Sequence, residues 1–353
     1  MRAESDVFEE LRARGHEGLW FASDPETGLR AIIGVHSTVL GPALGGTRIR
    51  PYRSVDEALI DVLRLSSGMT YKAAAAGLPL GGGKAVVIAD PSKKTPELLT
   101  AYGRAIDRLG GTYVTAEDVG STVEDMEIIA RATSHVTGLP VSAGGSGDPS
   151  PATAHGVIAS MRAVSEFLWG TADLAGRSIA VQGVGKVGSV LAALLAEAGC
   201  TLIVADVDRA AVAEVVEATG ARPVDVEGIL REPCDILAPC ALGAVFDEHT
   251  IPRLRCTAIV GSANNQLLGP EDAQRIAAAG ITYVPDFVAN AGGIVNIAEE
   301  FHPDGYSWDR ALTSLQRIHD TTLRVLEEAA KTGVGTREVA VALAEDRLLT
   351  AAR

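Results

Sequence analysis

The sequence is poor in aromatic residues, has few cysteines, contains no long hydrophobic run and carries no excess of positive charge. Aromatic side chains make up 4% of the 353 residues. Acidic residues outnumber basic ones by 45 to 31, so the formal net charge is −14. Nucleic acids and anionic membrane surfaces favour basic partners, so we expect neither as a binding partner of this chain.

Its hydrophobic runs are too short to cross a membrane. The longest uncharged run of interest, residues 73–83, is interrupted by Gly77 and Pro79, whereas a membrane-spanning helix needs about 20 apolar residues. The first eighteen residues alternate acidic and basic groups and lack the apolar core of a signal peptide. We therefore expect a soluble, cytoplasmic protein.

The cysteines form no CxxC pair and have no histidine at the spacing of a zinc site. There are four of them: Cys200, Cys234, Cys240 and Cys256. Disulfides are rare in the reducing cytoplasm, and a free cysteine behaves as a small apolar residue. We expect reduced, buried thiols and no bound metal.

The chain length and the order of the elements predict an α/β protein of two domains. At roughly 150 residues per domain, a chain of this length suggests two. The Gly-, Ser- and Pro-rich segment 141–151 is typical of a connection between domains. Before it, the pattern predicts three strands, at 29–35, 85–89 and 112–115. It also predicts two helices, which begin at the capping sequences Ser54–Glu57 and Ser121–Glu124.

Beyond this connection, strands and helices alternate from a long helix at 152–169 to a strand at 282–285. Such alternation implies a parallel, doubly wound sheet. The C-terminal part is helical, and we expect its last helix to return to the first domain. We predict an α/β substrate and catalytic domain of residues 1–140 plus 330–353 and a Rossmann-type NAD-binding domain of residues 141–329, separated by a cleft.

A glycine-rich sequence directly follows one predicted strand and opens a helix. Its glycines allow a tight turn that brings backbone amides and the helix N-terminus close to a pyrophosphate. Asp206 ends the next strand, at the spacing of the acid that binds the adenosine ribose, and it would repel a 2′-phosphate. We predict an NAD site, although a glycine-rich turn without a ligand is the simpler alternative. The site comprises Gly183, Val184, Gly185, Lys186, Val187, Gly188 and Asp206.

Two lysines bracket the uncharged segment 73–83. Lys72 continues an apolar helical face that includes Met69, and Lys84 follows three consecutive glycines. Neither flank supplies a carboxylate. If both groups face a cleft, burial and mutual repulsion favour the neutral amine, which is the form that acts as a base. Exposed surface charges are the alternative interpretation.

A pair of carboxylates, Glu117 and Asp118, follows the strand predicted at 112–115. Loops that follow strands often carry catalytic acids. Helix capping is the competing role, but Ser121 is better placed to cap the next helix. Adjacent residues of an extended chain point in opposite directions, so we expect at most one of the two carboxylates to face the site.

Five ordered motifs resemble those of the glutamate, leucine, phenylalanine and valine dehydrogenases, and the likeness is greatest to the leucine/valine branch. The resemblance runs nearly from end to end and implies a homo-oligomeric enzyme. Its implied activity is the reversible, NAD-dependent oxidative deamination of an L-amino acid to a 2-oxo acid and ammonia. The motifs are Leu44-Gly-Gly-Thr-Arg48, Met69-Thr-Tyr-Lys72, Gly81-Gly-Gly-Lys84, Thr115-Ala-Glu-Asp-Val-Gly120 and Asn290-Ala-Gly-Gly-Ile294.

The resemblance also implies a role for individual residues. Lys72 would hold the substrate α-carboxylate, helped by the backbone at Gly45 and Gly46. Lys84 would be the catalytic lysine that activates water, and Asp118 would be the acid/base at the amino nitrogen. The resemblance places Thr153 and Asn290 near the nicotinamide, and it places Asn265 near both the nicotinamide and the substrate.

The side-chain pocket that the resemblance implies is apolar in this sequence. Glutamate-specific relatives carry a lysine at the position of Leu44, so a glutamate side chain would lose its hydration here without gaining a counter-charge. We expect valine, leucine or isoleucine as the substrate. A phenylalanine or broad-specificity dehydrogenase is the alternative, and a non-catalytic NAD-binding protein is a more remote one. The pocket positions are Leu44, Met69, Ala116, Ile294 and Ile297.

Overall fold

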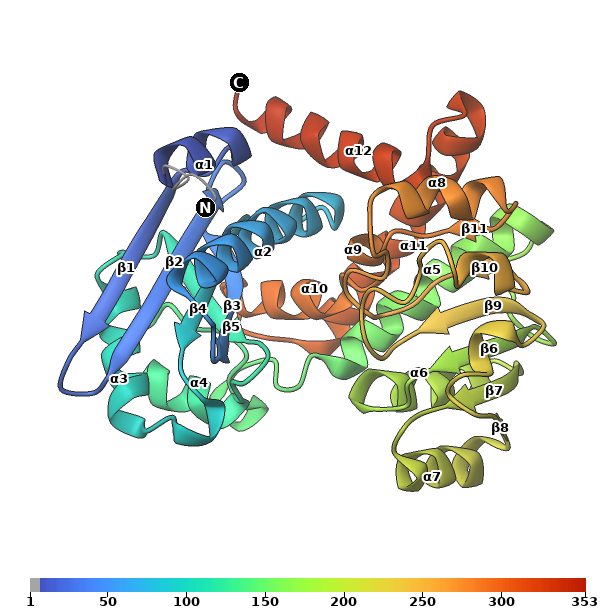
Figure 1. Ribbon diagram of the computed structural model, residues 1–353, viewed down its shortest axis with the longest axis horizontal. Coiled ribbons are helices and arrows are strands. Elements are labelled where there is room, and N and C mark those ends of the chain that lie inside the picture. Colours follow the sequence, from blue (N-terminus) through green and yellow to red (C-terminus); the bar gives the residue numbers. More distant parts are fainter. Residues whose placement is uncertain (1–6) are drawn as a thin grey trace. The chain divides into compact units, whose positions relative to one another are not determined.

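The computed structural model describes residues 7–353 and divides them into two compact units (Figure 1). Residues 1–6, which belong to the segment in which no signal peptide is expected, lie outside the described residues. Unit 1 extends to Asp148 and also includes Ile297–Ser307 and Ala344–Arg353, while unit 2 comprises Pro149–Asn296 and Trp308–Leu343.

The units differ from the predicted domains in where the chain passes from one to the other. Residues 141–148 and 297–307 belong to unit 1. One carboxylate joins these two segments, because Glu300 Oε1 accepts hydrogen bonds from the backbone N–H groups of Gly138 and Ser146 at 2.9 Å each. The sequence contains no local signal for this long-range bond, so neither boundary follows from composition alone.

Unit 1 is built on a five-stranded mixed sheet of order β1-β2-β4-β3-β5. β1 and β2 are antiparallel, as are β2 and β4, whereas β3 runs parallel to both β4 and β5. The strands are β1 Gly18–Asp24, β2 Leu29–Ser37, β3 Ala43–Arg50, β4 Gly81–Ile88 and β5 Tyr113–Glu117; the helices are α1 Val7–Arg14, α2 Val55–Ala75, α3 Pro96–Asp107 and α4 Val123–Ala130.

The two faces of this sheet have different neighbours. On one face, Val86 packs with α2 residues such as Val62, and on the other face Val87 packs with Leu99 of α3. A Cβ atom on Gly82 would lie 2.1 Å from the Thr70 backbone nitrogen, so β4 and α2 are in direct contact. Because side chains alternate along a strand, Lys84 lies on the same face as Gly82 and Val86, beneath α2.

Capping decides where the two predicted helices of unit 1 begin. Ser54 caps α2, as the sequence predicts, and its side chain accepts a hydrogen bond from the Glu57 N–H. The prediction that Ser121 caps the next helix is wrong by one residue. Thr122 is the N-cap of α4, because it forms a reciprocal capping box with Asp125.

Unit 2 contains a six-stranded sheet of order β11-β10-β9-β6-β7-β8 in which every strand pair is parallel. This confirms the predicted doubly wound sheet. The strand order reverses next to β6, and ligands bind at such switch points in open α/β sheets. The strands are β6 Ser178–Gln182, β7 Thr201–Ala205, β8 Arg222–Pro223, β9 Cys234–Pro239, β10 Cys256–Ile259 and β11 Thr282–Tyr283.

The helices of unit 2 begin with α5, which is the long helix that the sequence predicts at 152–169. The final helix, α12, ends in unit 1, where Arg347 donates hydrogen bonds to the carbonyl oxygens of Ala74 and Leu78 at 3.0 Å each. This confirms the expected return of the C-terminus. The helices are α5 Ser150–Trp169, α6 Lys186–Glu197, α7 Arg209–Thr219, α8 Glu271–Ala278, α9 Asp286–Ala289, α10 Gly292–Ala298, α11 Trp308–Thr332 and α12 Thr336–Ala351.

Within residues 7–353, no helix is long and apolar enough to span a membrane. The same residues contain no cluster of three or more histidine, cysteine, aspartate or glutamate side chains that could hold a metal ion. Burial raises the pKa of Cys200 to about 11 and that of Cys256 to about 12. Both thiols are therefore protonated at neutral pH, which is the inert form.

Candidate active site

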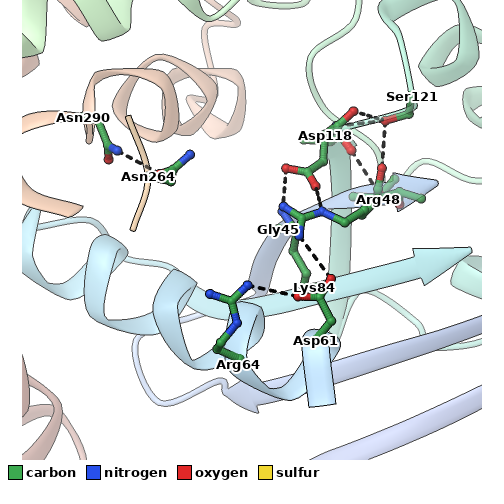
Figure 2. Close-up of polar contacts among 12 residues, drawn as sticks. Gly45, Arg48, Asp61, Arg64, Lys84, Asp118, Ser121, Asn264 and Asn290 are labelled. Carbon is green, nitrogen blue, oxygen red and sulfur yellow. Dashed lines mark hydrogen bonds and ion pairs between the residues drawn. The ribbon is translucent and has the colours of Figure 1, made fainter. Parts of the chain in front are cut away.

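Several charged groups of unit 1 meet in the middle of β4 and in the turn after β5 (Figure 2). Lys84 Nζ lies 3.0 Å from Asp118 Oδ1, and the lysine side chain is only 7% exposed. The residues that flank Lys84 in the sequence supply no carboxylate, and its partner comes instead from the turn after β5. A buried ammonium and a carboxylate in contact can exchange a proton directly.

The second carboxylate oxygen of Asp118 is bound by an arginine. Arg48 Nε donates to Asp118 Oδ2 at 2.9 Å. Burial on its own would raise the pKa of Asp118, but the adjacent Lys84 ammonium and Arg48 guanidinium outweigh it and lower that pKa below its ordinary value. Asp118 is therefore a carboxylate at neutral pH, ready to accept a proton. Arg48 closes one of the five motifs, but no role was predicted for it.

The turn that carries Asp118 is fixed to β3. The Asp118 backbone N–H donates to Ser121 Oγ at 2.8 Å, and that hydroxyl donates to the carbonyl oxygen of Thr47, also at 2.8 Å. Gly120 has a φ of +83°, and a Cβ atom there would lie 1.9 Å from the Ile49 carbonyl oxygen. Ser121 therefore positions the turn instead of capping α4, and only glycine fits at position 120.

Two glycines of β3 allow its neighbours β4 and β5 to approach it closely at this point. A Cβ atom on Gly45 would lie 1.8 Å from the Gly83 carbonyl oxygen, and one on Gly46 would lie 2.3 Å from the Glu117 carbonyl oxygen. Either substitution would push apart the strands that carry Lys84 and Asp118. That the backbone at Gly45 and Gly46 binds the substrate carboxylate stays a prediction.

The other predicted substrate residues of unit 1 surround the same face of the sheet. Leu44 and Ala116 are almost completely buried, and the strand registers place them on the Lys84 side. Met69 and Lys72 are half-buried near the end of α2, the helix that packs on that face through Thr70. Ile297, in the last turn of α10, also belongs to unit 1.

In unit 2, the glycine-rich loop joins β6 to α6 as predicted. Gly183 has a φ of +94° and lies against Ala241, while a Cβ atom on Gly188 would be 1.9 Å from the Gly183 carbonyl oxygen. Gly185 faces open space, and no side chain caps the first turn of α6, which begins with Lys186 and Val187. These uncapped amides form a cradle that suits a pyrophosphate.

Asp206 lies at the end of β7 beside this loop. Its Oδ2 accepts a hydrogen bond from the Val184 N–H at 2.7 Å, and its Oδ1 accepts one from the Asp208 N–H at 2.9 Å. The same carboxylate borders a cavity of about 660 Å³ that is also lined by the charged residues Arg209 and Asp225 and by apolar residues such as Val212 and Val224. A cavity of that size next to an acid fits an adenosine with its ribose hydroxyls at Asp206.

The predicted nicotinamide residues of unit 2 gather around the start of α10. Asn290 Nδ2 donates to the Ser262 carbonyl oxygen at 3.1 Å and to Asn264 Oδ1 at 2.8 Å (Figure 2). Within residues 7–353, Asn290 Oδ1 is buried and lacks a hydrogen-bond partner. A buried acceptor without a partner is costly, so this oxygen fits a ligand that brings an N–H group, such as a carboxamide.

Three further predicted residues lie in the same unit. Thr153, in the first turn of α5, lies beside Gly293. A Cβ atom on Gly293 would be 3.0 Å from Thr153 Oγ1. Ile294 follows in α10 and is buried. Asn265 has a φ of +52°, unusual for a residue with a side chain, and its backbone N–H donates to Asp286. Such conformations often occur at functional sites.

Comparisons with known proteins agree with these features. The model of the Glu/Leu/Phe/Val dehydrogenase dimerisation domain matches residues 17–135, and that of the glutamate/leucine/phenylalanine/valine dehydrogenases matches 144–212 and 201–353. A leucine dehydrogenase of Geobacillus stearothermophilus is 47% identical over 98% of this chain and 94% of its own. A phenylalanine dehydrogenase of Thermoactinomyces intermedius is 46% identical over 97% of this chain and 94% of its own.

The crystal structure of an L-tryptophan dehydrogenase from Nostoc punctiforme matches this chain with a TM-score of 0.87 and 42% identity, covering 99% of both chains. The family resemblance and the two-domain α/β fold that the sequence predicts are thereby confirmed. The chain belongs to the Glu/Leu/Phe/Val family of amino-acid dehydrogenases, which are oxidoreductases that typically use a nicotinamide cofactor.

Proposed function

We propose that this chain catalyses the reversible, NAD-dependent oxidative deamination of an aliphatic branched-chain L-amino acid to its 2-oxo acid and ammonia. The observation that carries the proposal is the buried pair of Lys84 and Asp118, 3.0 Å apart, on the same apolar face as Leu44 and Ala116. The chemistry needs a proton acceptor and a lysine in a site with little water, and this pair provides both.

In this proposal, each group in unit 1 has one task. The Lys72 ammonium binds the substrate α-carboxylate. Asp118 accepts a proton from the substrate ammonium group, and NAD, held by unit 2, would supply the acceptor for the hydride of Cα. While Asp118 later returns its proton to the leaving nitrogen, Lys84 acts as a neutral amine and removes a proton from the water that attacks the imino carbon. As an ammonium it then stabilises the developing oxyanion until the carbinolamine collapses to the oxo acid.

The substrate class is proposed from the residues predicted to line the side-chain pocket, because identity to the relatives does not separate leucine from phenylalanine dehydrogenases. Leu44 offers no charge to a glutamate side chain, whose burial would be costly. Ile294 and Ile297 are β-branched and stiff, and they lie three residues apart in α10. We infer a pocket for branched aliphatic chains, with phenylalanine or a broad range of amino acids as the alternative.

The choice of NAD over NADP is proposed from Asp206. Its carboxylate would accept hydrogen bonds from ribose hydroxyls and would repel a 2′-phosphate. Residues of the loop from Gly183 to Gly188 would hold the pyrophosphate, and Asn290 Oδ1 would accept the carboxamide N–H. Unit 2 would thus be the NAD-binding domain and unit 1 the substrate and catalytic domain.

We also propose that the chain forms a homo-oligomer in the cytoplasm. It matches a domain model described as a dimerisation domain. In addition, β1 is an edge strand of the unit 1 sheet and leaves Trp20 and Phe21 37% and 59% exposed. An apolar edge strand is normally covered, because its free backbone groups otherwise pair with other chains.

Initial rates of NADH formation with valine, leucine, isoleucine, phenylalanine and glutamate, each with NAD and with NADP, test the proposal. We expect the highest kcat/KM with a branched aliphatic substrate and NAD. A phenylalanine rate tenfold above the others would establish the alternative substrate. NAD binding without turnover of any amino acid would identify a non-catalytic NAD-binding protein.

A further inference from the structure

Five charged side chains of unit 1 form a continuous row that ends at Lys84 (Figure 2). Arg64 Nη2 donates to Asp61 Oδ1 at 3.1 Å, and Arg48 Nη1 donates to Asp61 Oδ2 at 3.1 Å. Arg48 Nε then reaches Asp118 Oδ2 at 2.9 Å, and Asp118 Oδ1 meets Lys84. Charges of opposite sign alternate along the row, from the surface of α2 to the buried lysine.

Burial differs sharply along this row. The Arg64 side chain is 48% exposed, whereas Arg48 and Asp61 are 17% and 13% exposed. Tyr52 adds a hydrogen bond to Asp61 Oδ2 at 2.8 Å. The Arg48 guanidinium is therefore held between two carboxylates by different N–H groups of one rigid plane. It cannot turn without losing a partner.

The row has a direct consequence for the carboxylate at its inner end. With Oδ2 bound to Arg48 and Oδ1 facing Lys84, the plane of the Asp118 carboxylate is set from both sides. We propose that Arg48, anchored by Asp61, is a positioning residue that orients Asp118 towards the lysine and holds it as a carboxylate until it accepts the substrate proton. This inference rests on the proposed function and assigns a role to residues outside the predicted catalytic set.

The electrostatics agree with this geometry. The groups that face Asp118 are Lys84 on β4 and Arg48 on β3, with Asp61 and Tyr52 behind the arginine. Burial would raise the pKa of Asp118, and the two cations lower it. Without the Arg48 charge, that pKa would rise, and a larger fraction of Asp118 would be protonated and unable to accept a proton in mildly acidic solution.

A purely structural bridge is the competing explanation, since Arg48 also joins β3 to α2 through Asp61. The pH dependence of the reaction separates the two explanations. A structural bridge changes stability and leaves the ionisation of Asp118 as it is. A positioning residue changes kcat and the acidic side of the pH profile.

The experiment compares Arg48→Gln, Arg48→Lys and the matched control Arg64→Gln, which loses a pair with the same Asp61 but does not touch Asp118. Initial rates with leucine and NAD are measured across pH, together with KM for both substrates and the melting temperature. For Arg48→Gln we expect kcat to fall about tenfold or more, and the acidic limb to move up by about one pH unit. KM values should change less than kcat.

Arg48→Lys keeps the charge and loses the planar geometry. We expect its acidic limb to stay near that of the wild type and its kcat to lie between those of the wild type and Arg48→Gln. Arg64→Gln should retain wild-type kcat and pH profile. If Arg48→Gln does not fold, Arg48→Lys decides: a reduced kcat supports the inference, and a wild-type kcat overturns it.

An unmoved acidic limb in folded Arg48→Gln, or an equal change in Arg64→Gln, would also overturn the inference. A carbon-13 NMR titration of the Asp118 carboxylate in wild type and Arg48→Gln provides a readout that needs no turnover. A wild-type enzyme without activity would refute the proposed function alone. An Asp118 that titrates identically in both proteins would refute the role of Arg48 alone.

Discussion

At the scale of single residues, the site depends on a lysine and an aspartate that are far apart in sequence and buried together. A buried ion pair is a weak source of stability, because desolvation offsets most of its Coulomb energy. Lys84 lies on β4 and Asp118 directly follows β5, and glycines of the intervening β3 allow these strands to come unusually close. Their arrangement is better explained by proton transfer than by folding stability.

Replacing Lys84 with alanine should abolish turnover and leave NAD binding intact. Its ammonium lies within reach of Asp118, and general acid–base groups contribute about 10²- to 10⁴-fold to a rate, so kcat should fall by at least the lower figure. Stopped-flow kinetics and NADH fluorescence titration measure the two effects. Lys93→Ala removes an exposed lysine and serves as the control. A wild-type rate in Lys84→Ala would remove this residue from the mechanism.

At the scale of secondary-structure elements, the close contact of β4 and α2 depends on Gly82. An alanine there would place its Cβ atom 2.1 Å from the Thr70 backbone nitrogen, so one element must move. We expect Gly82→Ala to destabilise the protein by about 1–3 kcal/mol and to lower kcat, since β4 carries Lys84. Urea unfolding followed by circular dichroism measures the change in free energy.

Gly68→Ala is the matched control for that substitution. Gly68 lies in α2, and nothing lies within 4 Å of the position of an added Cβ atom. Because alanine favours helices over glycine by about 1 kcal/mol, this variant should be as stable as the wild type or more stable. Equal destabilisation by both substitutions would contradict the steric argument.

A second prediction at this scale concerns the histidines between β2 and α2. His16 Nε2 lies 2.8 Å from Ser66 Oγ, and His36 Nδ1 lies 2.8 Å from Thr70 Oγ1. Burial, followed by the nearby His36, lowers the pKa of His16 from 6.5 to about 4. Burial also lowers the pKa of His36.

Because the unfolded chain binds these protons more readily than the folded one, stability should be complete above pH 6.5 and should decrease as the pH falls from there towards 4. Melting temperatures measured over that range should show the decrease. His16→Asn should flatten the curve relative to the wild type. A curve of unchanged slope in this variant would exclude His16 as a source of the acid sensitivity.

The elements also show how far sequence alone could predict the fold and the site. β2, β4 and β5 were predicted, whereas β1 and β3 were missed. In β3, Gly45 and Gly46 weaken the strand pattern. The motifs identified Lys84 and Asp118, but the bond between them needs the parallel register of β3 with both β4 and β5. Arg48 was missed for the same reason, since its partners come from other elements.

At the scale of the whole molecule, the charge of the site opposes that of the chain. The sequence carries a net charge of −14, yet Asp118 is flanked by two cations, Lys84 and Arg48. Lys72 lies on the helix that covers the same face. An excess of positive charge on this face suits a substrate that presents a carboxylate, and the acidic remainder keeps the protein soluble and disfavours polyanions.

The last prediction concerns assembly. The apolar edge at β1, formed by Trp20 and Phe21, should be covered by a second copy if the proposed oligomer forms through it. Adjacent residues of a strand point to opposite faces, so both faces of this edge carry an exposed aromatic ring. Phe21→Glu places a charge on the edge, and charged edge strands resist pairing.

Light scattering coupled to size-exclusion chromatography should therefore give a smaller mass for Phe21→Glu than for the wild type, with the mass rising at higher protein concentration. Leu268→Glu changes an equally exposed apolar residue in unit 2 and should leave the mass unchanged. A monomeric wild type would contradict the oligomer itself. A charge buried at a shared sheet edge has no counter-ion there, so it would weaken the association of the two copies. A wild-type mass in Phe21→Glu would therefore show that the interface lies elsewhere.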